Sequence, residues 1–238
     1  VKNGKLDAAL IDMKCRKVLA AKYWAGLHQY RPVMLHNLSA DLNKAEYTML
    51  QRKLIETSIT VLQNKHNLLP LKRLDTLKVA SVVFSNENDT SFSNTLGLYM
   101  PVKRFHINGD NLLKSDSILA DLRNYNLIVA SLHSTSVNKE LQYGLHKSFF
   151  TIVDSLTAKY PVIIDIFGNP YLLNRLSKAE RAKSILVSYE NAELVQELSA
   201  QMIFGATGAT GTLPVTCGNW MANQSGIKVK NSGRLSFA

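Results

Sequence analysis

The sequence predicts an α/β fold, a three-layer α/β/α sandwich with a mostly parallel sheet. Short β-branched runs alternate along the chain with stretches that suit helices, a pattern typical of parallel strands joined by helical crossovers. The runs are apolar at successive positions, as expected for strands covered on both faces. The strand candidates are 79–84, 102–107, 127–130, 162–166 and 185–187, and the helix candidates between or after them are 111–123, 143–158 and 191–203.

Two more helices are expected ahead of the sheet. Ile11, Val18 and Leu19 are spaced as on one side of a helix, and Gly26 is a suitable left-handed stop. Residues 27–37 lose this periodicity and suggest a linker, and a second long helix is expected over about 41–63. The sequence therefore predicts three parts: a helix with a linker (1–37), the sandwich domain (38–224), and a Gly-, Ser- and Lys-rich extended tail or linker (225–238).

Composition limits the classes of protein. A chain of 238 residues with 46% hydrophobic side chains can bury a full core. The formal net charge is +10, but the basic residues are scattered, which favours a solvated surface over a nucleic-acid site. The sequence has no apolar run long enough for a membrane span, and its start has neither Met nor a signal peptide, so we expect a processed or truncated chain.

The motifs of common catalytic and cofactor sites are missing. Cys15 and Cys217 have no metal-site spacing, so we expect both to be buried apolar residues and expect no metal. The glycines of 205–211 follow a predicted helix and precede a strand-like segment, the reverse of a phosphate loop, so a helix stop is favoured. No GxSxG elbow is present. We expect no cofactor.

Several polar residues lie at or near the ends of predicted strands, where open parallel sheets bind ligands. The carboxylates are Glu87, Asp89, Asp165 and Glu190, and His133 follows the 127–130 strand. For each of them a structural role is favoured. Asp165 is expected to be held by backbone donors, and Glu190 and Asn191 are expected to cap the next helix.

Four motifs follow one another in an order that resembles the family 3 glycoside hydrolases, the β-glucosidases and β-N-acetylglucosaminidases. They are residues 17–27, residues 50–71 with Leu68-Leu69-Pro70-Leu71, residues 167–173, and residues 201–216. In that family a (β/α)8 barrel with the nucleophilic Asp is followed by an α/β sandwich domain. The resemblance implies that residues 1–37 hold the last barrel helix and that the nucleophile would precede Val1.

The resemblance also implies partners and a site. The partner would be the N-terminal barrel of the same polypeptide, with carbohydrate bound through it, and no catalytic residue is expected in this chain. Loops after the strands would wall the sugar site, and the substrate-binding candidates are Glu87, Asn88, Asp89, His133 and Asn169. The tail 232–237 is similar to a junction that leads to a β-lactamase-type serine-hydrolase domain. The parent is expected to be a bacterial β-N-acetylglucosaminidase or β-glucosidase, periplasmic or secreted.

Two other functions remain open. The charge of +10 suits a non-enzymatic binding module for an anionic glycan or nucleic acid. A free-standing small-molecule enzyme ranks last, because no nucleophile-base pair is visible.

Overall fold

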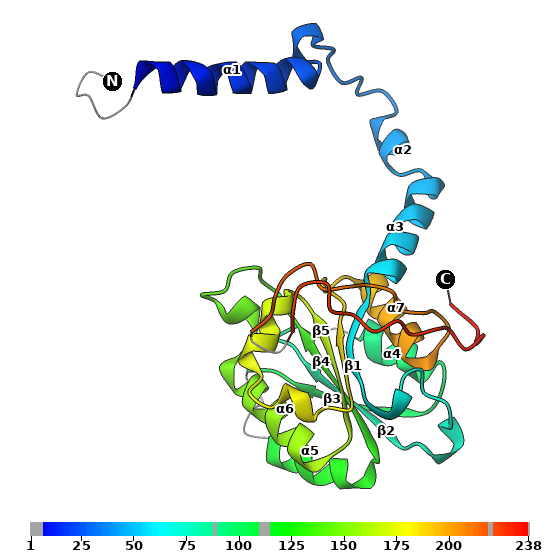
Figure 1. Cartoon of the computed structure of the whole chain (residues 1–238). Coiled ribbons are helices and arrows are strands. Elements are labelled where there is room, and N and C mark those ends of the chain that lie inside the picture. Colours follow the sequence, from blue (N-terminus) through cyan, green and yellow to red (C-terminus); the bar gives the residue numbers. More distant parts are fainter. Residues whose placement is uncertain (1–6, 88–89, 110–114, 219–220, 238) are drawn as a thin grey trace. The chain divides into compact units, whose positions relative to one another are not determined.

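A computed structural model describes residues 7–87, 90–109, 115–218 and 221–237. The chain divides into two compact units, Val1–Thr48 and Met49–Ala238 (Figure 1). Helix α3 (Ala45–Ser58) crosses the boundary between them.

The first unit consists of helices without a core of their own. Helix α1 (Ala8–Trp24) begins where the Asp7 carboxylate accepts from the Ala9 amide, and Gly26 follows it with a φ of 78°. A 3-10 turn, η1 (Leu27–Gln29), and helix α2 (Leu38–Leu42) complete the unit. Cys15 is exposed, so the prediction of a buried residue is wrong at this position, because the described residues of the unit bury no side chain of α1.

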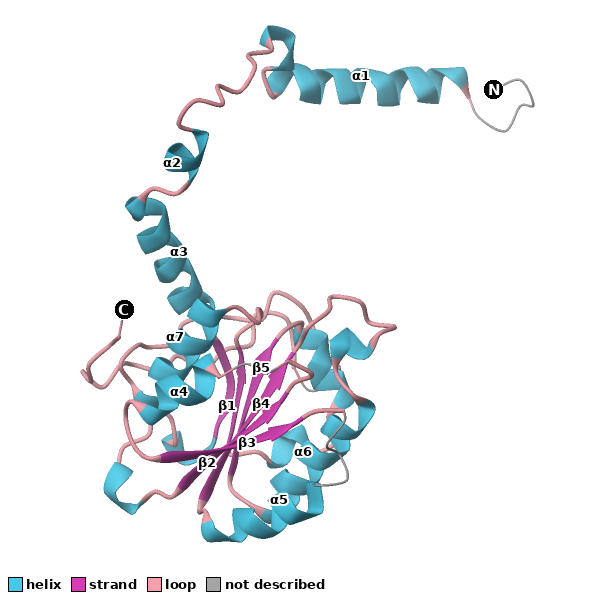
Figure 2. Cartoon of the chain, turned by 180° about the vertical axis from the view of Figure 1, so that it is seen from behind, coloured by secondary structure: helices cyan, strands magenta, loops and turns pink. Residues whose placement is uncertain are grey.

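The second unit is built on a six-stranded sheet in the order β1-β6-β5-β4-β2-β3 (Figure 2). All neighbours are parallel except β1, which runs antiparallel to β6 at one edge. The strands are β1 (Thr60–Asn64), β2 (Val79–Phe84), β3 (Val102–Ile107), β4 (Leu127–His133), β5 (Val162–Phe167) and β6 (Ser184–Val187).

Helices cover both faces of this sheet. Helices α4 (Ser91–Gly97) and α7 (Glu193–Phe204) lie on one face, and α5 (Ser115–Asp121) and α6 (Lys147–Lys159) lie on the other (Figures 1 and 2). Each face has its own apolar core, and successive β4 residues alternate between them: Ile128 joins the α6 core and Val129 joins the α7 core. With this period of two, every β4 residue is buried under one helical layer or the other. The predicted sandwich with a mostly parallel sheet is confirmed.

Two elements differ from the prediction. The helix expected to continue to residue 63 ends at Ser58, and Thr60–Asn64 is the edge strand β1. Ile59, Thr60 and Val61 are β-branched, which favours a strand; all three are buried, and Thr60 and Val61 pair with β6. Helix α4 was not predicted from its polar sequence, although Phe92 and Leu96 bury its inner side.

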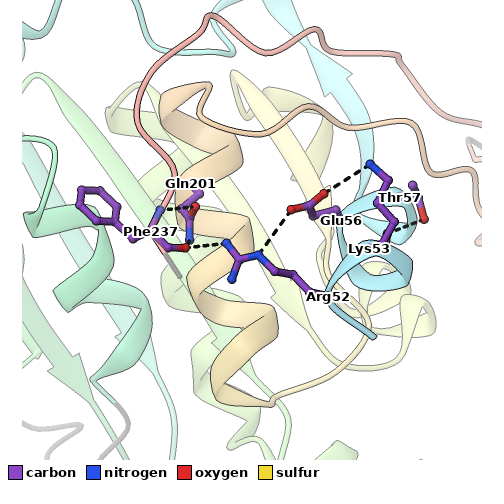
Figure 3. Close-up of polar contacts among 6 residues, drawn as sticks. All are labelled: Arg52, Lys53, Glu56, Thr57, Gln201 and Phe237. Carbon is purple, nitrogen blue, oxygen red and sulfur yellow. Dashed lines mark hydrogen bonds and ion pairs between the residues drawn. The ribbon is translucent and has the colours of Figure 1, made fainter. Parts of the chain in front are cut away.

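The C-terminal segment lies extended against the second unit. Helix α7 stops at Gly205, whose φ of 80° fulfils the predicted helix stop, and Val229 pairs with Ala209. Farther on, the backbone of Phe237 makes two hydrogen bonds to the Gln201 side chain, and its carbonyl also accepts from Arg52 of α3 (Figure 3). Phe237, at the end of the described chain, is therefore hydrogen-bonded to Arg52 of α3 and to Gln201 of α7.

Candidate functional site

A hollow of about 600 Å³ lies at the carboxyl ends of the parallel strands. Its walls come from the segments that directly follow β2, β4, β5 and β6, where buried apolar strands give way to polar residues. We call it the strand-end pocket. It is lined by Glu87, Ser134, Thr135, Ser136, Val137, Gly168, Asn169, Tyr189, Glu190 and Asn191.

The middle of the pocket depends on a close approach of two loops. The Ser134 amide donates to the Phe167 carbonyl and extends the β4–β5 ladder by one bond. Directly beyond it, a Cβ on Gly168 would lie 2.4 Å from the Ser134 Cβ. Only glycine fits there, because real side chains do not approach that closely. The next residue, Asn169, starts the 3-10 helix η7 (Pro170–Arg175) by accepting from the Tyr171 amide at 3.0 Å.

His133 lies beneath the pocket and does not line it. The residue is fully buried as the last position of β4, and its ring stacks on Phe167 with the centroids 4.6 Å apart. Its Nε2 atom is 2.9 Å from the Ser131 hydroxyl, and its Nδ1 atom is 2.8 Å from Oδ1 of Asn191, which does line the pocket. His133 is therefore placed to position Asn191.

The direction of these hydrogen bonds follows from one backbone group. The Phe92 amide can only donate, and it donates to Gln196 Oε1, so Gln196 Nε2 is the atom that donates to Asn191 Oδ1. Asn191 Oδ1 is then an acceptor, and His133 Nδ1 must carry the proton. The other ring nitrogen, Nε2, shares a hydrogen bond with the Ser131 hydroxyl. This network joins the start of α4 to the pocket wall.

Tyr189 connects the pocket to β1. Its backbone is left-handed, with a φ of 66°, which is uncommon for a bulky residue and costs about 1 to 3 kcal/mol. Its hydroxyl lies 2.7 Å from Thr60 Oγ1 and donates to the Thr212 carbonyl at 3.3 Å. Burial raises the pKa of this phenol. The strained turn is thus held by hydrogen bonds at the tip of the side chain.

Acidic groups dominate the charge of this region. Among the described lining residues Glu87 and Glu190 are the charged ones, and no lysine or arginine joins them. In the strand below, Asp165 is fully buried and accepts from the hydroxyls of Ser199 and Ser188. Burial raises the pKa of Asp165 to about 6, and the hydrogen bonds from the two serines only partly oppose this. A pocket of this kind suits an uncharged, hydroxyl-rich ligand better than an anion.

The structure brings together two of the predicted substrate-binding residues. Glu87 and Asn169 line the same pocket, His133 lies under it, and Asn88 and Asp89 fall outside the described residues. That any of them contacts substrate stays a prediction. The expectation that Glu190 and Asn191 cap α7 is wrong: Ala192 occupies the cap position without a side-chain bond, while Asn191 bonds to His133.

Sequence reasoning missed the lining residues Ser134 to Val137, Tyr189, and the part played by Asn191. Each lies within four residues of the observed end of a parallel strand, but the predicted strand 127–130 stopped three residues short of the end of β4. The described residues contain no group of three or more His, Cys, Asp or Glu side chains that could hold a metal ion. In the same part of the chain, no helix is long and apolar enough to span a membrane.

Solved structures share this fold. The match to a family 3 β-N-acetylglucosaminidase from Paenibacillus covers 89% of this chain and 40% of the enzyme's chain, at a TM-score of 0.59 and 20% identity. A β-glucosidase from Listeria innocua matches 87% with 32% of its own, at a TM-score of 0.56 and 21% identity. The chain resembles the family 3 glycoside hydrolases. The resemblance predicted from the sequence motifs is thereby confirmed.

Curated relatives agree with this resemblance. A β-xylosidase of Formosa agariphila is 23% identical over 250 residues, which cover 87% of this chain and 33% of the relative. A putative β-xylosidase of the same organism is 25% identical over 243 residues, which cover 90% of this chain and 32% of the relative. The chain therefore spans about a third of the length of these relatives. No family model matches the sequence.

Proposed function

We propose that this chain is the α/β sandwich domain of a β-glycosidase and that the strand-end pocket forms one wall of its sugar site. The observation that carries the proposal is the convergence of four strand ends on a polar, acidic hollow. In open parallel sheets ligands bind at this edge. The likeness to family 3 β-N-acetylglucosaminidases and β-glucosidases supports the same assignment.

The catalytic barrel would belong to the same polypeptide and precede this domain. Hydrolysis of a glycoside requires two carboxyl groups that flank the scissile bond. We assign the nucleophile to that barrel. The strand-end pocket would then bind hydroxyl groups of the sugar through the carboxylates of Glu87 and Glu190 and the amides of Asn169 and Asn191.

The relatives suggest which sugars to test. Their names specify β-xylosides, β-glucosides and β-N-acetylglucosaminides, and all three sugars are uncharged. An acidic pocket accepts such sugars without placing two negative charges side by side. Residues 232–237 would lead into a further domain of serine-hydrolase type in the parent, as the sequence resemblance implies.

The test compares two proteins. The chain alone and a form extended with its upstream coding region are assayed on aryl β-xyloside, β-glucoside and β-N-acetylglucosaminide. We expect turnover only by the extended form, and the preferred substrate names the sugar. Hydrolysis by the chain alone would contradict the assignment of the nucleophile to a barrel. An extended form that folds but cleaves none of the three would overturn the glycosidase assignment.

A further inference from the structure

A second hollow, of about 450 Å³, differs in chemistry from the strand-end pocket. We call it the tyrosine cavity, and it is lined by Lys139, Tyr143, Tyr171, Asn174 and Arg175. Its residues come from two connections, the segment between β4 and α6 and the helix η7 after β5. Its volume lies within the range of ligand pockets, about 300 to 1,000 Å³.

Tyr143 is held rigidly in the wall of this cavity. Its φ is 59°, a left-handed conformation that is uncommon for a bulky side chain. Its carbonyl accepts from the Thr135 and Ser136 amides at 3.2 Å each and from the Ser134 hydroxyl at 2.8 Å. These three bonds offset the strain and fix the position of the ring, which packs in the core on the α6 side.

The hydroxyl of Tyr143 has no hydrogen-bond partner among the described residues, although the residue is only 3% exposed. The phenols of Tyr99, Tyr160 and Tyr189 each have one. This oxygen is not among the fully buried atoms of the described residues that lack a partner, so it is accessible from the cavity. A ligand in the cavity can therefore accept a hydrogen bond from it or donate one to it.

The other walls supply positive charge and an aromatic surface. Lys139 and Arg175 are both exposed, and neither forms an ion pair within the described part of the chain. Glu140 follows Lys139 in sequence but does not line the cavity. The ring of Tyr171 is 41% exposed, and Asn174 adds an exposed amide.

We infer that the tyrosine cavity binds an acidic sugar, a uronic acid unit of an oligosaccharide. The planar guanidinium of Arg175 matches a carboxylate, and Lys139 adds a second cation. The half-exposed Tyr171 ring offers an apolar surface to the face of a sugar, while Asn174 and the Tyr143 hydroxyl bond to its hydroxyl groups. This inference does not depend on the proposed glycosidase function, since it concerns binding by this chain alone.

The test is a ligand-observed NMR titration of the full chain with methyl β-D-glucuronide and methyl β-D-glucoside. These probes differ at the sugar carboxylate, so their affinity ratio isolates the charge. We expect the glucuronide to bind about tenfold more tightly, the value of one charge-assisted hydrogen bond. Equal affinity for the two probes would overturn the inference. Inorganic sulfate that binds as tightly as the glucuronide would also overturn it, because the cavity would then recognise charge without the sugar.

Variants locate the binding. Arg175→Gln should remove most of the tenfold preference, whereas Arg123→Gln, a matched change at an exposed arginine outside the cavity, should keep it. Tyr143→Phe deletes only the unpaired hydroxyl and should weaken both sugars several-fold while the protein stays folded. Binding that survives both cavity variants unchanged, or falls equally with Arg123→Gln, would place the sugar elsewhere.

Discussion

The strand-end pocket and the tyrosine cavity share two connections but carry opposite charge. Residues 134–137 and 168–169 line the pocket, and only a few positions later residues 139, 143, 171, 174 and 175 line the cavity. The pocket contains Glu87 and Glu190, whereas the cavity contains Lys139 and Arg175. The segments after β4 and β5 therefore take part in two hollows of opposite charge, in line with the two ligands proposed above, an uncharged sugar for the pocket and an acidic sugar for the cavity.

The largest expected change in the free energy of unfolding comes from His133, which lies under the strand-end pocket. His133→Ala removes a buried ring and leaves Asn191 and Ser131 without a shared partner, so we expect a loss of about 4 kcal/mol in the free energy of unfolding. Ser131→Ala removes one bond of the same network and should cost about 1 kcal/mol. Urea unfolding of both variants checks this order. Equal losses would show that the ring itself is not what holds the network.

The buried carboxyl of Asp165 gives the domain a pH-dependent stability. Its pKa is raised to about 6, so the unfolded chain ionises first and stability falls as the pH rises from about 4 to about 6, then stays level. Asp165→Asn should flatten this slope and stabilise the protein by about 2 to 3 kcal/mol at pH 7.5. Thermal unfolding across this pH range measures both, and an unchanged slope in Asp165→Asn would contradict the assignment.

The close approach of the loops at Gly168 and Ser134 gives a smaller change in the free energy of unfolding. Gly168→Ala places a methyl group 2.4 Å from the Ser134 Cβ and should cost about 2 kcal/mol. Gly97→Ala is the matched control, because a Cβ there has nothing within 4 Å, and it should be neutral or stabilising by up to about 1 kcal/mol. Chemical unfolding compares them. Similar values would mean that the loops move apart without cost.

The smallest expected change in stability distinguishes the tyrosine of the strand-end pocket, Tyr189, from that of the tyrosine cavity, Tyr143. Tyr189→Phe removes a hydroxyl bonded to Thr60 and Thr212 and should cost about 1 kcal/mol. Tyr143→Phe removes a hydroxyl without a partner in the described residues and should leave the free energy of unfolding unchanged within about 0.5 kcal/mol. A destabilised Tyr143→Phe protein would show that its hydroxyl is already satisfied.

Sequence reasoning predicted the central strands well because they are buried on both faces. The run at β2 was placed with its observed bounds, since apolar and β-branched residues fill it, and β3 also has its predicted bounds although it contains Lys103, Arg104 and His106. The edge strand β1 was missed because Val61 also continues the helical spacing of Leu50 and Leu54, and only pairing with β6 decides between helix and strand. Local sequence does not contain that tertiary contact.

The site was predicted only as far as topology allows. Glu87 and Asn169 could be placed at the sheet edge because they follow parallel strands. The burial of His133 could not be predicted, since it depends on Phe167, Asn191 and Ser131, which come from three strands or their loops. The tyrosine cavity had no sequence signal at all, because its residues lie in irregular segments without a spacing rule.

The most direct test of the strand-end pocket is kinetic. In the extended, active protein, kcat/KM on the preferred aryl β-glycoside is measured for Glu190→Gln and for Glu180→Gln, the same change at an exposed glutamate outside the pocket. We predict a decrease of about tenfold for Glu190→Gln, as for one lost charge-assisted hydrogen bond, and no change for Glu180→Gln. An unchanged kcat/KM in Glu190→Gln, or an equal decrease in both, would contradict the claim that this pocket contacts the sugar.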